Sequence, residues 1–297
     1  MVVICIIVLN KIYNIFIWLM IVIIIVVMLY FVIRIFFVDW FRIPTESMMP
    51  TLVSGDNVVV DKTLIGARIY TDFHFNPKGG ELRSVRTRGR RDIRHNDIVI
   101  FNKANHKRKI KFIINNVYCK RCIALPGDTI SIVNGYYKNN NYDQPLGIEA
   151  EQERIVNTPD SILNNMRVLR AMPKDSHFHW TIRNFGPMYI PRKGDVMMIT
   201  PESATIHKVI LEWEIGKEIR INWQDSVVTA DGKPFKMHRF EHNYYFMAGD
   251  HVINSDDSRY KGPVPEEYIV GIVTHVINSE DPDTKETRWE RIGRIQK

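Results

Sequence analysis

The feature that most constrains this chain is an uninterrupted run of 19 apolar residues, from Ile15 to Ile33. At about 1.5 Å per residue, a helix of this length spans about 28 Å, close to the apolar thickness of a bilayer. A cleaved leader would have a shorter apolar core and a small-residue cleavage site, but neither alanine nor glycine precedes Gly55. A helix packed on a soluble core would show a polar face. Residues 1–38 are therefore predicted to form a membrane anchor with one transmembrane helix.

Charge is unevenly distributed along the 297 residues, whose formal net charge is +7. Residues 78–111 carry twelve Lys and Arg against three acidic residues, a net charge of +9, while residues 1–77 are neutral. This pattern excludes a coiled coil, a disordered tail and a uniformly basic nucleic-acid coat. The first half of this block, which follows Pro77, is expected to be an exposed loop that contacts anionic lipid or solvent, and no nucleic-acid partner is expected. Lys11 before the apolar run is nearly balanced by Arg34 and Arg42 after it, so charge leaves the orientation open.

Beyond the anchor, a turn signal of Gly or Asn followed by Asp repeatedly precedes a short apolar run, which is typical of β-strands joined by tight turns. Asp231-Gly232 lies between two further runs and predicts a hairpin. We expect a mostly β, antiparallel fold, with weak helical periodicity only in residues 147–170. The predicted strands begin near Val58, Ile98, Ile130, Val196 and Val252.

Two patterns could indicate metal or redox chemistry. Cys119 and Cys122 lie in a predicted strand, where residues three apart point to opposite faces, so we expect two unpaired thiols. The segment His238–His242 matches a zinc-peptidase pattern that requires a helix, but it runs into a strand-like stretch. We therefore expect no metal and no cofactor.

A serine and a lysine carry the chemistry that the sequence suggests. Ser47 lies between Pro44 and Pro50, which stiffen the backbone around it, as suits a nucleophile whose own N–H binds an oxyanion. Lys120 has apolar neighbours on both sides, and burial would keep it neutral enough to act as a base. Taken alone, each could equally be an ordinary loop serine or an edge-strand lysine.

Four sequence blocks, in order, give these residues a context. They are Ser47-Met-Met-Pro-Thr-Leu, Asn96-Asp-Ile-Val-Ile-Phe, Lys120-Arg-Cys-Ile-Ala-Leu-Pro-Gly-Asp, and the stretch from Gly249 to Pro265. With the preceding membrane span, this set resembles the bacterial signal peptidase I (leader peptidase) family. The resemblance extends from Ile43 to about Gly271. It implies a serine endopeptidase that cleaves signal peptides from exported preproteins without a cofactor.

The resemblance also assigns roles to individual residues. Ser47 is the expected nucleophile and Lys120 the expected general base. Thr45 would share the oxyanion hole with the Ser47 amide, and Ser255 would form a hydrogen bond with the lysine. The supporting positions are Arg121 and the ion pair of Asp257 and Arg259, and the tentative substrate contacts are Met48 and Pro50.

Two residues depart from the family pattern. His251 follows the Gly-Asp of the last block, where asparagine is common, and Glu46 lies beside the nucleophile, where a small residue is usual. Glu46 is expected to point away from Ser47, because a carboxylate close to the dyad would raise the pKa of Lys120.

The resemblance further implies architecture and location. The catalytic β core would comprise residues 39–135 and 238–279, interrupted by a smaller β-rich lobe at residues 136–237 and followed by a tail at 280–297. The catalytic part would lie outside the cytoplasm on a single-pass cell-membrane anchor, with signal peptides, the bilayer and possible export machinery as partners. A narrower Ser–Lys processing peptidase and a non-catalytic anchored homologue remain alternatives.

Overall fold

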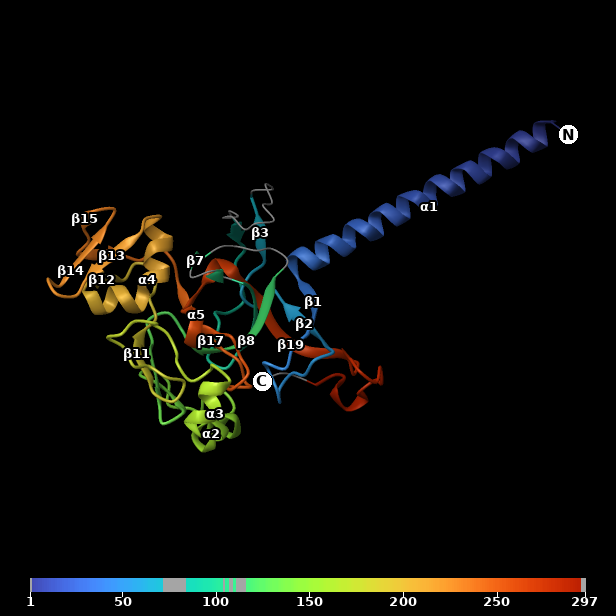
Figure 1. Ribbon diagram of the computed structural model, residues 1–297. Coiled ribbons are helices and arrows are strands. Elements are labelled where there is room, and N and C mark those ends of the chain that lie inside the picture. The colour runs from blue at the N-terminus through green and yellow to red at the C-terminus, as the bar shows by residue number, and fades with distance from the viewer. Residues whose placement is uncertain (1, 72–83, 104, 107–108, 111–115, 295–297) are drawn as a thin grey trace.

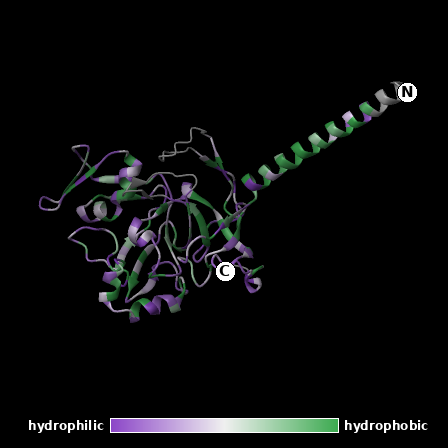
Figure 2. Ribbon diagram, turned by 45° about the vertical axis from the view of Figure 1, so that its right-hand side comes forward, coloured by the Kyte–Doolittle hydropathy of each residue, from purple (hydrophilic) through white to green (hydrophobic). Residues whose placement is uncertain are grey.

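A computed structural model describes residues 2–71, 84–103, 105–106, 109–110 and 116–294. Its first element, α1 (Val2–Phe36), projects away from the rest of the molecule (Figure 1). Residues Leu9–Phe36 are long and apolar enough to cross a membrane, and none of that span is buried by the protein. Figure 2 shows the same helix as almost continuously hydrophobic. An apolar helix whose span is not buried by its own chain has its apolar surface left for lipid, as the sequence predicts.

A charged cluster fixes the end of α1 to the first strand, β1 (Val38–Arg42). Arg34 Nε donates to Asp39 Oδ1 at 2.9 Å, and Lys62 Nζ lies 3.1 Å from Asp39 Oδ2. Lys62 Nζ also donates to the carbonyl oxygen of Arg34 at 2.6 Å, which satisfies a group at the helix end. The Arg34 guanidinium lies over the ring of Trp40, 4.7 Å from its centroid. The anchor is thus joined to the sheet by several interactions rather than by a free linker.

The core is a seven-stranded sheet in which every neighbouring pair is antiparallel. The strands Ile98–Asn102 and Tyr244–Ala248 are buried along their whole length, and the strand Val117–Ala124 is buried from Lys120 onward, so side chains pack on both faces of the sheet there. The strand order is β1, β2 (Asp56–Asp61), β19 (Ile269–Ser279), β5 (Ile98–Asn102), β8 (Val117–Ala124), β17 (Tyr244–Ala248) and β18 (Val264–Pro265). Strands from both ends of the described chain therefore meet in one sheet, which confirms the mostly β, antiparallel fold.

Between β8 and β17, the chain forms smaller sheets and three helices. β9 (Thr129–Val133) pairs with β10 (Tyr136–Asn139) and β11 (Phe185–Tyr189) rather than with the core sheet. The other elements are β12 (Val196–Met198) with β16 (Met237–Arg239), β13 (Ile219–Asn222) with β14 (Val227–Ala230) and β15 (Lys233–Pro234), and the helices α2 (Glu149–Asn157), α3 (Asp160–Asn165) and α4 (Pro201–Ile215). From this pairing we propose that the inserted segment extends from Thr129 to Arg239.

The helix α4 is an element that the sequence analysis does not anticipate. Thr200 and Ser203 form a capping box at its start, Pro201 occupies its first turn, and Gly216 ends it in the left-handed region at φ 64°. These are standard helix-start and helix-stop residues. They could have identified the helix within a segment that otherwise favours strands.

Short elements complete the fold. They are β3 (Arg68–Tyr70) with β4 (Ser84–Arg86), β6 (Asn105–His106) with β7 (Lys109–Ile110), α5 (Ser258–Lys261), and the 3-10 turns η1 (Glu266–Tyr268) and η2 (Trp289–Arg291).

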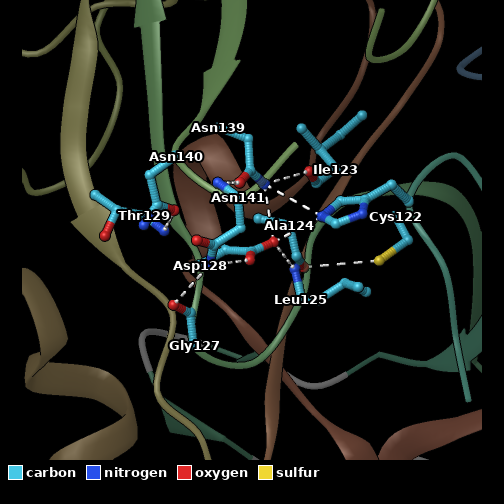
Figure 3. A network of polar contacts seen from close by, with 11 residues as sticks. Cys122, Ile123, Ala124, Leu125, Gly127, Asp128, Thr129, Asn139, Asn140 and Asn141 are labelled. Carbon is cyan, nitrogen blue, oxygen red and sulfur yellow. Dashed lines mark hydrogen bonds and ion pairs between the residues drawn. The ribbon is translucent and has the colours of Figure 1, made fainter. Parts of the chain in front are cut away.

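Asp128 holds the turn where the core sheet passes into the inserted segment (Figure 3). Its Oδ2 accepts hydrogen bonds from Leu125 N and Asn139 Nδ2, both at 2.8 Å, and lies 2.7 Å from His95 Nε2. Asn141 Nδ2 donates to the other oxygen at 3.0 Å. Burial alone would raise the pKa of this carboxyl, but these bonds bring it down to about 2. The buried carboxylate therefore stabilises the junction between the two parts of the molecule.

In the described part of the basic block, three arginines form specific contacts within the protein, which the expectation from charge did not include. Arg86 donates to the carbonyl oxygens of Gly66, Glu266 and Ile269. Arg91 forms two hydrogen bonds with Asp97, and Arg90 pairs with Asp61. These guanidinium groups hold strand ends and turns together. Residues 78–83 of the predicted loop lie outside the described residues.

Most predicted strands are present, with one exception. β2, β5, β9 and β12 begin at or next to the predicted runs, and the Asp231-Gly232 turn joins β14 to β15. The run at Val252 is a turn instead, and the strand β17 precedes Gly249. His238 lies on β16 and contacts Glu214, while His242 contacts Glu267. The zinc-peptidase pattern is therefore not on a helix, and the described residues include no cluster able to hold a metal.

Candidate active site

Ser47 lies in a turn that follows directly from the first core strand. After β1, Ile43 N donates to the Asp56 carbonyl oxygen at 2.7 Å, and Leu52 N donates to the Met48 carbonyl oxygen at 2.9 Å. The side chains of Ile43, Met48 and Leu52 are buried in one apolar cluster with β2 and β5. These apolar anchors fix the backbone on both sides of Ser47 while its hydroxyl stays half-buried.

Lys120 approaches Ser47 from β8 in the middle of the sheet. It is paired opposite Val99 of β5 and is 3 % exposed. Its Nζ lies 2.5 Å from Ser47 Oγ, although 73 positions separate the two residues. Burial lowers the pKa of the Lys120 ammonium, and nearby Arg259 lowers it further against the opposing charge of Asp257. A buried lysine with a lowered pKa, in contact with a hydroxyl, can accept the proton of that hydroxyl.

Thr45 lies beside the same hydroxyl. Its Oγ1 is 3.4 Å from Ser47 Oγ, so a hydrogen bond between them can run in either direction. Thr45 Oγ1 is therefore close enough to contact a substrate atom bonded to Ser47 Oγ. Glu46, the unusual neighbour, is exposed to solvent.

The segment after β17 forms a buried polar support beneath Lys120. Asp257 and Arg259 are fully buried and make two hydrogen bonds, Nε to Oδ1 at 2.8 Å and Nη2 to Oδ2 at 2.6 Å. Ser255 Oγ donates to Asp257 Oδ2 at 2.6 Å. Among the described hydrogen bonds, none joins Ser255 to Lys120, which differs from the role that the resemblance assigns. The buried carboxylate of Asp257 instead accepts the hydrogen bond from the Ser255 hydroxyl.

Arg121 faces away from Lys120 and holds the nucleophile turn through a second buried ion pair. Its Nε and Nη2 each lie 2.7 Å from an oxygen of Asp250, and its Nη1 donates to the Asn96 carbonyl oxygen. Thr51 Oγ1 donates to Asp250 Oδ2 at 2.5 Å. The pair therefore joins β8, the end of β17 and the turn that carries Ser47.

Asp250 and Thr51 are not among the site residues predicted from the sequence. Asp250 could have been suspected, because it lies in the Gly-Asp turn of the last block. Nothing local marks Thr51, because its role depends on a contact across 199 positions.

His251, the second unusual residue, contacts the backbone of the turn that carries Ser47. Its N–H donates to the Ser47 carbonyl oxygen at 3.2 Å, and its Nδ1 lies 3.3 Å from the Glu46 carbonyl oxygen. These contacts fix the turn without placing the imidazole against the Ser47 hydroxyl.

A cavity of about 370 Å³ opens over Ser47 and Lys120. Its walls come from the turn after β1 and from the strand β8, and Met48 is among them. Pro50 is exposed and lies outside this lining. The residues that complete the walls are Ile43, Pro44, Thr45, Asn116, Val117, Tyr118, Cys119, Asn254 and Asp256. An extended peptide could lie between these two segments with one of its carbonyl groups at Ser47.

Comparisons with known proteins agree with this geometry. The family model described as "Signal peptidase, peptidase S26" matches residues 15–277. A protein named Signal peptidase I from Buchnera aphidicola subsp. Schizaphis graminum is 28% identical, over 89% of this chain and 77% of its own length. One of the same name from the subspecies Baizongia pistaciae is 27% identical, over 91% and 80%. A third, from Pseudomonas aeruginosa, is 24% identical, over 89% and 72%.

Proposed function

The chain belongs to the signal peptidase family, peptidase S26, and we propose that Ser47 and Lys120 form the catalytic dyad with which it acts. It is a membrane-anchored signal peptidase that cleaves the signal peptides of preproteins. The observation that supports the dyad is the 2.5 Å approach of Lys120 Nζ to Ser47 Oγ. Burial of the same lysine favours its neutral form, which a base requires.

Acylation begins with a proton transfer within the dyad. Neutral Lys120 accepts the Ser47 proton while Ser47 Oγ attacks the scissile carbonyl carbon. The carbonyl oxygen becomes an oxyanion, for which the Ser47 N–H and the Thr45 hydroxyl are the proposed donors. When the intermediate collapses, the C–N bond breaks and the Lys120 ammonium gives its proton to the leaving amine. The mature protein leaves, and the signal peptide stays bound as an ester of Ser47.

Deacylation uses the same groups. Lys120, neutral again, accepts a proton from a water molecule that attacks the ester carbonyl. The C–Oγ bond then breaks, Lys120 returns a proton to Ser47 Oγ, and the signal peptide leaves with a new carboxylate. Arg121, Ser255, Asp257 and Arg259 are proposed as positioning residues, because their buried hydrogen bonds fix the elements that carry the dyad.

We propose that the cavity over the dyad binds the substrate residues before the cut, and that these residues are small, as in A-x-A cleavage sites. Met48 is a proposed wall of that site. Pro50 is not retained as a substrate contact, because it lies outside the cavity.

The short segment between α1 and Ser47 suggests where the reaction occurs. Nine residues, Asp39 to Ser47, separate the span from the nucleophile and can reach at most about 30 Å. Much of this distance is taken up by β1, which the Arg34–Asp39 contact holds close to the end of α1. We propose that the site works near the lipid surface of the cell membrane, on the extracytoplasmic side, where exported preproteins emerge from the export machinery.

Cleavage of a preprotein by the full chain in detergent or vesicles tests the dyad. Wild type should release the mature protein at one bond, whereas Ser47→Ala and Lys120→Ala should reduce kcat/KM by at least about 10⁴-fold. Exposed Lys233→Ala serves as a control with unchanged activity. Full activity in Lys120→Ala would contradict the assignment of the base.

The same assay separates the alternatives. Cleavage of one substrate among many preproteins would favour a narrower processing peptidase. Failure of wild type to cut any preprotein would favour a non-catalytic homologue.

A further inference from the structure

A second cavity of about 710 Å³ adjoins the site on the side of the inserted segment. Its walls come from α4, from the loop at residues 167–175 and from the segment that ends in α5. Asn254 and Asp256 line both this cavity and the cavity over Ser47. The two cavities therefore adjoin at these two residues, and together they would form two sections of one groove beside the dyad.

The second section is cationic. Arg167, Lys174, Lys208 and Lys261 line it, against Asp175 and Asp256, which leaves a net charge of +2. Lys261 pairs with Asp256 at 3.3 Å and Lys208 with Glu212 at 3.6 Å. The exposed side chains of Arg167 and Lys174 have no ion pair among the described residues. Two cations at the groove are therefore available to a ligand.

The anchor indicates which part of a substrate reaches this section. The apolar segment of a signal peptide lies in the membrane and precedes the cleaved bond, so residues before the bond come from the side of the lipid. In the structure, α1 leaves the molecule beside β1 and β2, whereas α4 lies on the far side of the core sheet (Figure 1). The section lined by α4 and α5 therefore lies on the side where the residues after the cleaved bond leave the site.

We propose that the groove formed by Arg167, Lys174, Lys208 and Lys261 binds the first residues of the mature protein and selects acidic side chains there. The inference rests on the proposed function and deepens it by assigning a charge preference to the substrate beyond the cut. Carboxylates of an extended mature segment would pair with Arg167 and Lys174 at an exposed surface. Exposed ion pairs are individually weak and are screened by salt, so the preference is modest and depends on ionic strength.

The test uses the full chain in detergent and three preproteins that share one signal peptide. Their second to fifth mature residues carry two Asp, two Ser or two Lys. Wild type should cleave the Asp substrate with a kcat/KM about five-fold above the Ser substrate, mainly through KM, and the Lys substrate less well. The preference should shrink on going from about 0.05 M to about 0.5 M salt.

Charge reversal identifies the groove. Arg167→Glu/Lys174→Glu should reverse the order of the Asp and Lys substrates, with the Ser substrate between them. Lys217→Glu/Lys233→Glu, which changes the net charge equally at exposed positions outside the groove, should keep the wild-type order. Equal cleavage of all three substrates by wild type, or an unchanged order in the Arg167/Lys174 variant, would overturn this inference and leave the proposed function intact. Absence of cleavage by wild type would instead refute the proposed function, and the inference with it.

Discussion

Gly249 lies against the backbone of Ser47, so that a Cβ added at Gly249 would come within 2.5 Å of the Ser47 carbonyl oxygen. The same Cβ would come within 2.3 Å of Ser255 Oγ. Both distances are well below van der Waals contact. Only glycine permits this approach, which joins the end of β17 to the turn that carries the nucleophile.

Gly249→Ala should therefore displace the nucleophile turn. We expect kcat/KM for preprotein cleavage to fall about 100-fold, because misplacing a reacting group by about 1 Å can have that effect. Gly232→Ala is the control, since nothing lies within 4 Å of its added Cβ and it occupies a distant hairpin turn at φ 75°. The control should lose some stability but no activity at a temperature where both variants are folded. Equal activity of the two variants would argue against the contact.

The pH dependence of cleavage should report the lowered pKa of Lys120. The neutral amine, which is the active form, predominates only above the pKa in the folded protein. The rate should rise with pH through that value and level off below the ordinary lysine value of 10.5. The measurement is kcat/KM against pH with one preprotein. A rise that continues to pH 10.5 would mean that burial does not lower the pKa of Lys120.

Lys120→Met should raise stability while it abolishes cleavage. Because the pKa is lower in the folded state, the unfolded chain binds an extra proton between the folded pKa and 10.5. The buried lysine therefore destabilises the fold fully below the folded pKa, and this penalty disappears as the pH rises to 10.5. Methionine removes this penalty, so the thermal midpoint at neutral pH should rise by about 2–6 °C. A lower thermal midpoint would show that other groups in the folded protein stabilise the charge of Lys120.

Thr45→Val tests the second oxyanion donor. Valine keeps the shape of the side chain but cannot donate, and loss of one such donor lowers kcat by about 10²–10³-fold. Thr45→Ser keeps the hydroxyl and should stay within about ten-fold of wild type. KM should change little in either variant, because the donor acts mainly on the transition state. Equal activity of the valine and serine variants would remove Thr45 from the mechanism.

Arg259→Met should destabilise the fold more than any surface charge change. It leaves Asp257 buried without its partner, which costs about 3–5 kcal/mol. Arg90→Met removes the exposed cation of the Arg90–Asp61 pair and should cost less than about 1 kcal/mol. Chemical denaturation of both variants measures the difference. Similar losses would mean that the Asp257 charge finds another partner.

Local sequence predicts the strands well where apolar runs follow a turn signal, as at Ile98 and Ile130. It fails at Val252, because Gly249 and Asp257 commit that segment to contacts with the nucleophile turn and with Arg259. It also fails for the basic block, whose arginines look like a solvated patch. Their partners, such as the Ile269 carbonyl oxygen for Arg86, lie up to 183 positions away.

By itself, the sequence determined the membrane anchor, the antiparallel β character and the candidate pair Ser47 and Lys120, because these depend on apolar length, local turns and short motifs. Only the tertiary structure decided that Lys120 Nζ lies 2.5 Å from Ser47 Oγ, that Asp250 holds Arg121, and that a cavity lined by four cationic side chains adjoins the site. The physical reason is that hydrogen bonds, burial and cavities depend on side chains brought together by strand pairing across scores of residues. No local pattern encodes which of those side chains will meet.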